Sequence, residues 1–106
     1  NINFNTDSYK FIGPATKILD QVASVILQHG YTKLEIWGYV DTQGSKASWI
    51  VLSKNRALAV KNYLTKKLLG SGVTIKNAGR AQTQAVGNNN TAAGRALNRR
   101  VEIRVS

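Results

Sequence analysis

Three stretches of the chain alternate apolar and polar residues, and this alternation restricts the possible folds more than any other feature. They span residues 34–40, 73–79 and 101–106, and each places its Leu, Ile and Val side chains on one side only. Neighbouring side chains of a β-strand point to opposite faces of the sheet, so the pattern indicates strands that bury one face. Strands of a doubly wound parallel sheet are apolar on both faces. The sequence therefore favours helices packed on a single face of an antiparallel or mixed sheet.

Two segments between these strands repeat their apolar residues with the period of an α-helix. The first, residues 14–29, begins with Pro14, which suits the first turn of a helix, and is followed by Gly30, which suits the end of one. The second, residues 48–69, carries a stripe of apolar residues spaced four apart. Both patterns predict a helix with one apolar face.

A short strand-like stretch, residues 2–4, precedes the first helix, and a polar connection, residues 81–98, precedes the last strand. The connection has room for one helical turn at residues 92–97, and a connection of this length is either mobile or functional. The element order predicts an α+β fold: a βαβαβ(α)β sandwich with the helices packed on one face of a mixed four-stranded sheet.

The length of 106 residues corresponds to one domain that can bury a core without a metal ion or a disulfide. No apolar run approaches the roughly 20 residues of a membrane-spanning helix, and the sequence shows no signal-peptide pattern. Because the chain opens directly on a strand-like stretch, we expect residues 1–106 to be a single domain excised from a longer protein. The absence of cysteine excludes disulfides and thiolate metal sites.

The chain is strongly basic, with 15 Lys+Arg against 5 Asp+Glu and a formal net charge of +10 at pH 7. After Asp41 the only acidic residue is Glu102. This balance has two interpretations. Solvated helix faces account for much of the charge, as we expect for Lys61, Lys66 and Lys67, or else the domain binds a polyanion.

Two charged residues stand where the pattern predicts apolar surroundings. Asp41 lies at the carboxyl end of strand 34–40, and Arg56 lies between Leu52 and Val60 on the helix stripe that faces the sheet. A short turn joins strand and helix, so we expect the two side chains to be neighbours. A buried guanidinium is costly unless it is paired. The residues alone leave two interpretations: a structural ion pair, or a pocket whose carboxylate and guanidinium bind the ammonium and carboxylate of one zwitterionic ligand.

Short motifs extend from one end of the chain to the other. They comprise Ile2 and Phe4; Gly38, Asp41 and Gly44; Leu52, Ser53, Arg56, Ala57 and Val60; and Gly94, Arg95, Asn98, Arg99, Arg100, Val101 and Glu102. This set resembles the OmpA-like peptidoglycan-binding domain of outer-membrane protein A, the peptidoglycan-associated lipoprotein and flagellar motor stators. The family pattern is I-x-F, then G-H-T-D-x-x-G, then N-x-x-L-S-x-x-R-A-x-x-V, and finally G-R-x-x-N-R-R-V-E. The separation of Asp41 and Arg56 along the chain also fits the family.

The resemblance implies a function, a location and a set of residues. Such domains bind peptidoglycan non-covalently and anchor larger envelope proteins to the cell wall, which implies a place in the cell envelope, periplasmic or facing the cell wall. Their aspartate and arginine grip the side-chain ammonium and carboxylate of diaminopimelate in the stem peptide, roles that fall to Asp41 and Arg56. Arg99 is expected to steady Asp41 or the pocket loop. The other residues expected to support the site are Gly44, Trp49, Leu52 and Ala57.

The chain departs from the family pattern beside the expected pocket. Tyr39 and Val40 replace the family's His and Thr, Trp49 replaces an Asn, and Arg80 replaces an aromatic residue. The first three changes remove polar groups that would contact or orient the ligand. For Trp49 two positions are open: over the bound peptide or an adjacent sugar, or at the start of the helix, where it closes the core.

The sequence offers no grouping of nucleophile, base and orienting residue, and its single histidine, His29, has no companion metal ligands. We therefore expect neither an enzyme nor a metal or cofactor site. Trp37 and Tyr39 are similar to the aromatic residues of RNA-binding sheets, but the K/R-G-F/Y-G/A-F-V-x-F/Y run is absent. Two alternatives remain. One is a binder of nucleic acid or a teichoic-acid-like polyanion, and the other is a protein-interaction domain of the same fold that has lost the glycan site.

Overall fold

The computed structural model describes residues 2–5, 8–41, 46–81 and 85–106. In chain order the elements are β1 (Ile2–Asn3), α1 (Ala15–His29), β2 (Lys33–Gly38), α2 (Lys46–Lys67), β3 (Thr74–Gly79), α3 (Ala92–Asn98) and β4 (Arg100–Val105). The strands form one sheet in the order β1-β4-β2-β3. β4 is antiparallel to β1 and β2, whereas β2 and β3 are parallel. The predicted α+β fold with a mixed four-stranded sheet is confirmed.

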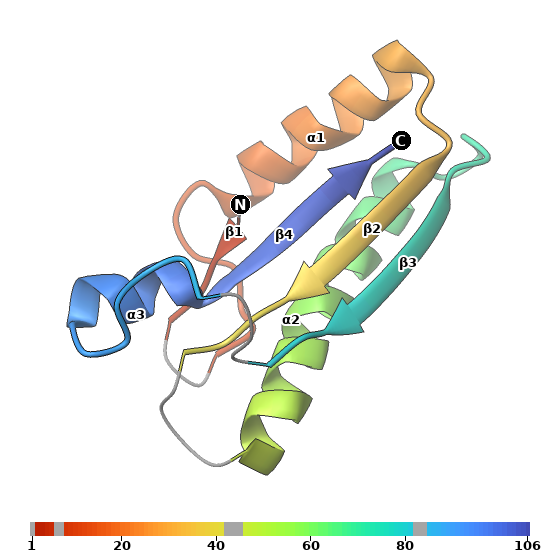
Figure 1. Cartoon of the computed structure of the whole chain (residues 1–106). Helices are drawn as coiled ribbons and strands as arrows, with labels where there is room; N and C mark the ends of the chain where they lie inside the picture. The colour runs from red at the N-terminus through yellow and green to blue at the C-terminus, as the bar shows by residue number, and fades with distance from the viewer. Residues whose placement is uncertain (1, 6–7, 42–45, 82–84) are drawn as a thin grey trace.

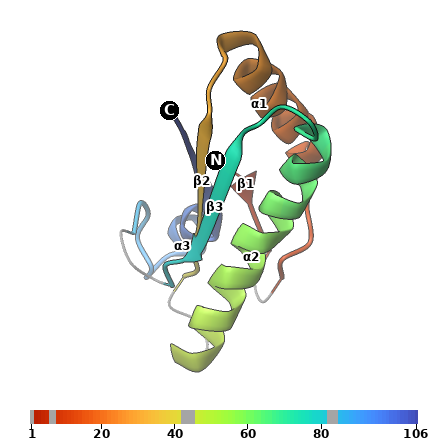
Figure 2. The same ribbon diagram turned by 90° about the vertical axis from the view of Figure 1, so that its right-hand side faces the viewer.

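The two long helices lie side by side on one face of the sheet (Figure 1). Figure 2 shows the sheet nearly edge-on, with α1 and α2 on one side of it and α3 on the other, near one end. The face turned away from α1 and α2 is called the open face below. Among the described residues, no helix is long and apolar enough to cross a membrane.

The start and end of α1 follow from its sequence. Pro14 directly precedes the helix, and Gly30 ends it in a left-handed conformation with φ 68°. The Gly30 N–H donates to the carbonyl of Ile26, which closes the last turn, and glycine adopts this conformation without steric cost. The buried face of α1 consists of Ala15, Leu19, Ala23 and Ile26.

A very close approach between α2 and the sheet fixes the position of that helix. A Cβ at Gly38 would overlap the carbonyl oxygen of Ser53, and one at Gly79 would overlap the backbone of Lys54. These glycines let α2 lie against the ends of β2 and β3. Its buried stripe contains Arg56 as well as Val60 and other apolar residues, as the spacing of four predicts.

Tyr39, which strand alternation places on the same face as Trp37, is buried. Tyr39 is 0% exposed, because the guanidinium of Arg100 from neighbouring β4 lies 3.9 Å from the centre of its ring. Trp37, two residues earlier, is only partly buried. Alternation therefore predicts the face of a side chain but not what covers that face.

Candidate functional site

Asp41 lies just beyond the last residue of β2. The parallel strands β2 and β3 finish at the same end of the sheet (Figure 1). Asp41 is 4% exposed, and its Oδ2 accepts a hydrogen bond from Nη1 of Arg99 at 3.0 Å. Arg99 stands between α3 and β4. The ion pair thus joins the end of one central strand to the start of its neighbour, and it is the contact predicted for a supporting Arg99.

Arg56 projects from α2 into the protein and is 1% exposed. Its guanidinium donates three hydrogen bonds to backbone carbonyls: Nε to Ser8 at 2.8 Å, Nη1 to Tyr39 at 2.9 Å and Nη2 to Asn5 at 2.9 Å. The same group lies 5.2 Å from the ring centre of Phe4. Burying a guanidinium is costly unless its donors are satisfied, and these bonds offset that cost.

Arg99 also binds the N-terminal part of the chain. Its Nε donates to the carbonyl of Phe4 at 2.8 Å, and the Phe4 N–H donates to the carbonyl of Arg99 at 2.9 Å. The carbonyls of Phe4, Asn5 and Ser8, called the carbonyl cluster below, therefore bind both arginines. Through this cluster the residues near β1, the start of β4 and the buried side of α2 are held together.

Among the contacts between described residues, the two charges that the sequence singled out bind different groups. The ion pair that the structure shows at Asp41 is formed with Arg99, and the hydrogen bonds that it shows from Arg56 end on carbonyls. Arg56 nevertheless binds the carbonyl of Tyr39, two residues before Asp41. Both signs of charge thus lie at one end of the sheet, an arrangement suited to a ligand with an ammonium and a carboxylate.

Ser53, one turn before Arg56 on α2, fixes the backbone beside the site. Its Oγ accepts from the Ala81 N–H at 3.1 Å and donates to the Ile50 carbonyl at 3.1 Å. The Ala81 carbonyl in turn accepts from the Val40 N–H at 2.9 Å. This chain of hydrogen bonds explains why a serine follows Leu52 in the motif.

Asn98 organises the connection that precedes β4. Its side chain is buried and accepts from the N–H groups of Val86 and Gly87, at 2.8 and 2.9 Å. The amide Nδ2 donates to the Gly87 carbonyl and to Oδ1 of Asn89. The asparagine of the N-R-R motif is therefore structural, and it positions the following Arg99.

The other predicted supporting residues lie on α2 or outside the described residues. Ala57 is 0% exposed and belongs to the core. Leu52 and Trp49 are partly buried, near the start of the helix. Gly44 lies outside the described residues. The roles of these residues in ligand binding stay predictions.

The carbonyl cluster is the part of the site that sequence reasoning missed. Its atoms belong to the backbone, so the identities of Phe4, Asn5 and Ser8 do not reveal them. The available signal was indirect: two arginines predicted near one buried aspartate need more acceptors than one carboxylate supplies.

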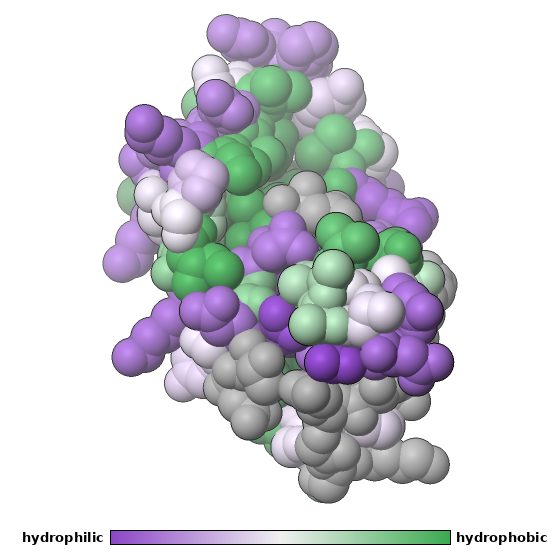
Figure 3. All heavy atoms as spheres, turned by 90° about the vertical axis from the view of Figure 1, so that its left-hand side faces the viewer, coloured by the Kyte–Doolittle hydropathy of each residue, from purple (hydrophilic) through white to green (hydrophobic). Residues whose placement is uncertain are grey.

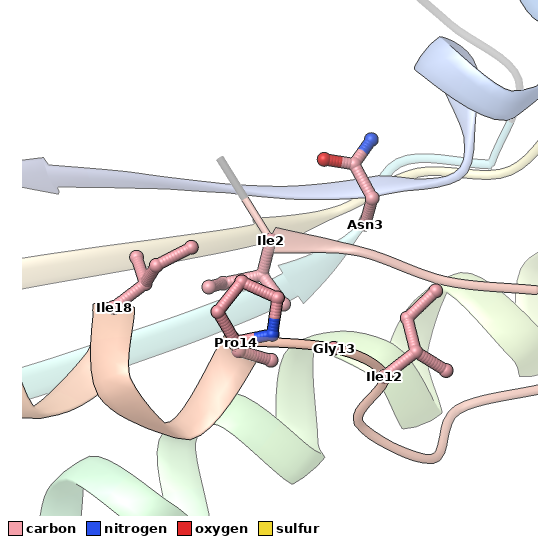
Figure 4. Close-up of a pocket in the computed structure, with 7 residues that line it drawn as sticks. Ile2, Asn3, Ile12, Gly13, Pro14 and Ile18 are labelled. Carbon is pink, nitrogen blue, oxygen red and sulfur yellow. The ribbon is translucent and has the colours of Figure 1, made fainter.

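A separate hollow lies between β1 and the start of α1. Figure 3 shows apolar and hydrophilic residues mixed on the left-hand side of the molecule as drawn in Figure 1. The volume of the hollow is about 240 Å³, and Figure 4 shows its mainly aliphatic lining. The lining residues are Ile2, Asn3, Ile12, Gly13, Pro14, Ala15 and Ile18. None of them is charged or belongs to the predicted site.

The fold and the buried charges together define a small α+β domain with charged side chains buried at one end of its sheet. Within the described ranges, no group of three or more His, Cys, Asp or Glu residues could hold a metal ion. The chain belongs to the OmpA family, whose model matches residues 3–99.

Three similar proteins illustrate this relationship. The peptidoglycan-binding protein ArfA of Mycobacterium tuberculosis is 35% identical over 105 residues, which cover 99% of this chain and 32% of that relative. The peptidoglycan-associated lipoprotein of Burkholderia pseudomallei has a TM-score of 0.83 at 24% identity, covering 99% of this chain and 88% of that one. The C-terminal domain of Helicobacter pylori MotB has a TM-score of 0.80 at 22% identity, covering 99% and 82%. The two structures support the fold, and the chain spans about a third of the length of ArfA.

Proposed function

We propose that this domain binds peptidoglycan non-covalently and anchors a larger protein to the cell wall, in the cell envelope. The observation that carries the proposal is the family match over residues 3–99, and a relative that is 35% identical and named as peptidoglycan-binding supports it. Membership in the OmpA family makes the chain a binding module rather than an enzyme.

The finer proposal concerns the ligand group and its partners. Asp41 binds the side-chain ammonium of diaminopimelate in the stem peptide, and Arg56 binds its carboxylate. Arg99 acts as a positioning residue, because its 3.0 Å contact fixes the orientation of the Asp41 carboxylate. The three bonds from Arg56 to carbonyls hold its guanidinium in one plane, which reduces the entropy lost on binding.

The depth of the site sets a condition for binding. Arg56 is 1% exposed and Asp41 is 4% exposed, so both are shielded from solvent. A ligand can reach them only if the neighbouring parts of the protein move aside. Binding that requires such a rearrangement has a lower association rate constant than binding to a preformed, open site. Once seated, the charged groups of the ligand interact in surroundings of low polarity, where charge-assisted hydrogen bonds are strong.

The test compares two peptides and three proteins. Wild type, Asp41→Ala and Arg56→Ala are titrated calorimetrically with a stem peptide that contains diaminopimelate and with one that contains lysine. Lysine keeps the ammonium but lacks the carboxylate, so wild type should bind the lysine peptide much more weakly. Arg56→Ala should lose roughly 2 to 5 kcal/mol with the diaminopimelate peptide and barely distinguish the two, because truncating one partner leaves the other charge unpaired.

Melting curves distinguish a loss of ligand binding from a loss of protein stability. Arg56 binds three carbonyls, so Arg56→Ala is also expected to melt earlier. Arg104→Ala provides the matched control, since Arg104 is an exposed arginine of β4 that lies opposite Glu35, whereas Asp41 follows the other end of β2. Folded Asp41→Ala and Arg56→Ala proteins that bind both peptides like wild type would end the assignment of these residues. Sacculus binding by such proteins would still support peptidoglycan as the ligand.

A further inference from the structure

The open face of the sheet carries a concentrated set of basic side chains that the peptide site does not use. Because side chains alternate along a strand, β2 presents Lys33, Glu35 and Trp37 on this face. β3 and the residue after it present Lys76 and Arg80. β4 presents Arg100, Glu102 and Arg104. Figure 2 shows that α1 and α2 lie against the opposite face.

Two arginines stack on one tryptophan at the centre of this face. The guanidinium carbons of Arg80 and Arg104 lie 4.3 and 4.1 Å from the ring centre of Trp37. They come from opposite sides of β2, because β3 and β4 are its two neighbours in the sheet. Two guanidinium groups are too large to share one face of an indole at these distances, so they cover both faces. Stacking restricts the arginine side chains and holds two positive charges close together.

Acidic residues offset only part of this charge. Arg100 and Glu102 form an ion pair at 2.7 Å and neutralise each other. The other charged groups of the face are Lys33, Lys76, Arg80 and Arg104 against Glu35, and within the described residues Glu35 forms no ion pair. A hollow of about 310 Å³ between β2 and β3 is lined by Lys33, Leu34, Glu35, Thr74 and Lys76. The face therefore attracts anions along most of its length.

The geometry favours phosphate groups over bases, sugars or a bilayer. Because both faces of Trp37 are covered, no base or sugar ring can stack there, and stacking is the usual basis of single-strand recognition. Of the exposed large apolar side chains among the described residues, only Val105 belongs to a strand, and alternation places it on the opposite face. The strands of the open face therefore lack the apolar surface that inserts into membranes. Arginine forks bind phosphate bidentately. We infer that the open face is a second binding site, for a linear polymer that carries phosphate groups, with Arg80 and Arg104 as its central contacts.

Short-chain inorganic polyphosphate, labelled for fluorescence anisotropy, is the probe. The Arg80→Gln/Arg104→Gln double variant should bind it more weakly, and its slope of log affinity against log salt should fall by about 1 to 2, as expected for two lost phosphate contacts. Lys61→Gln/Lys66→Gln removes the same charge from α2 on the other face and should bind nearly like wild type. Equal weakening of the two double variants would reduce the proposal to net charge alone and overturn it.

A variant that binds polyphosphate more strongly cannot be explained by misfolding, because a misfolded protein would bind more weakly. Glu35→Gln removes the unpaired acid of the open face and should strengthen polyphosphate binding, whereas Asp20→Asn, on α1, makes the same charge change elsewhere and should not. Stronger binding to anionic phospholipid vesicles than to polyphosphate, or base-dependent binding to single-stranded DNA, would contradict the proposal. Asp41→Ala should retain polyphosphate binding and Arg80→Gln/Arg104→Gln should retain peptide binding, so failure of one site is distinguishable from failure of the other.

Discussion

Arg56 is the residue proposed to bind the ligand carboxylate, and the structure shows that it also holds parts of the fold together. Its three hydrogen bonds to carbonyls join α2 to the N-terminal part of the chain and to the end of the sheet. Lysine could not replace it, since an ammonium on a flexible stem cannot reach three acceptors in a fixed plane. The spacing along the helix predicted that Arg56 is buried. It could not predict the carbonyl acceptors, because these are backbone atoms brought together by the fold.

Tyr39 provides a test of an unsatisfied polar group. Its ring is buried beneath Arg100, and its hydroxyl has no hydrogen-bond partner among the residues that the structure describes. A buried unsatisfied hydroxyl costs about 1 to 3 kcal/mol, so Tyr39→Phe should unfold at equal or higher denaturant concentration than wild type. Chemical denaturation of both proteins measures the difference. Clear destabilisation by Tyr39→Phe would mean that the hydroxyl has a partner, such as a buried water molecule.

Trp49 distinguishes ligand contact from core packing. We propose that it packs over the bound peptide or an adjacent sugar, exchanging the hydrogen bond of the family's asparagine for apolar contact. Adding the diaminopimelate peptide should then quench or shift tryptophan fluorescence in wild type. The Trp49→Phe variant retains Trp37 and should show no such change. An unchanged wild-type spectrum at saturating peptide would assign Trp49 to the core.

At the scale of elements, the contact between α2 and the sheet depends on glycine. Gly38→Ala would push a Cβ against the Ser53 carbonyl, which is backbone and cannot rotate away. Overpacking of this kind costs about 1 to 3 kcal/mol, and it should also weaken peptide binding, because Arg56 lies one turn beyond Ser53. Gly30→Ala is the control. Its Cβ meets nothing within 4 Å, so it reports only the strain of a positive φ. Equal stability and binding of Gly38→Ala and wild type would contradict the close approach.

A polar contact links the two long helices and makes a prediction about pH. Tyr63 of α2 donates to Oδ1 of Asp20 of α1 at 2.7 Å, and Lys67 lies 3.3 Å from the same oxygen. The Tyr63 hydrogen bond, together with Lys67, lowers the pKa of Asp20. A carboxyl whose pKa is lowered in the folded state stabilises the protein above its unfolded pKa, and this stabilisation is lost as pH falls through the folded pKa.

The pKa of Asp20 should therefore rise toward its ordinary value in Tyr63→Phe, measured by NMR titration of the carboxyl carbon. Below the folded pKa, where Asp20 is protonated in both proteins, the part of their stability difference that comes from the Asp20 charge should disappear. Tyr31→Phe serves as the control. Tyr31 also contacts another side chain, but its ring stacks on His29, with 5.7 Å between the ring centres. An unchanged Asp20 pKa in Tyr63→Phe would contradict the role of the hydrogen bond.

Most helices and strands could be predicted from the sequence. The contacts that bury particular side chains on the sheet could not. The start of α1 was predicted to within one residue, from the helical period of its apolar residues and from Pro14 and Gly30. Three strands were predicted from the alternation of apolar and polar residues. These signals are local, so they survive without knowledge of the fold. The burial of Tyr39 depends on Arg100, which is distant in sequence, and the stack on Trp37 depends on strand order. Both are consequences of pairing between strands that no local pattern encodes.

At the scale of the whole molecule, some basic side chains are buried and bound to other groups of the protein, whereas others lie on the surface. Arg56 and Arg99 are held inside by carbonyls and by Asp41, and Arg100 is paired with Glu102. The formal charge of +10 seen by a distant polyanion therefore comes mainly from lysines on the helices and from the open face. Two ligands of different chemistry could bind at the same time, one at the end of the sheet and one across its open face.

Salt separates these two modes of binding. Contacts with a phosphate polymer release counterions, so their affinity falls steeply with log salt. A zwitterion held between buried charges is screened much less. Binding to insoluble peptidoglycan sacculi should therefore persist from low to moderate salt, while polyphosphate binding by the same protein declines. Pull-down with sacculi, in parallel with anisotropy titrations at each salt concentration, gives both curves. If sacculus binding disappeared together with polyphosphate binding, and polyphosphate competed for it, the sacculus would be held by surface charge, and Asp41 and Arg56 would be left with a structural role.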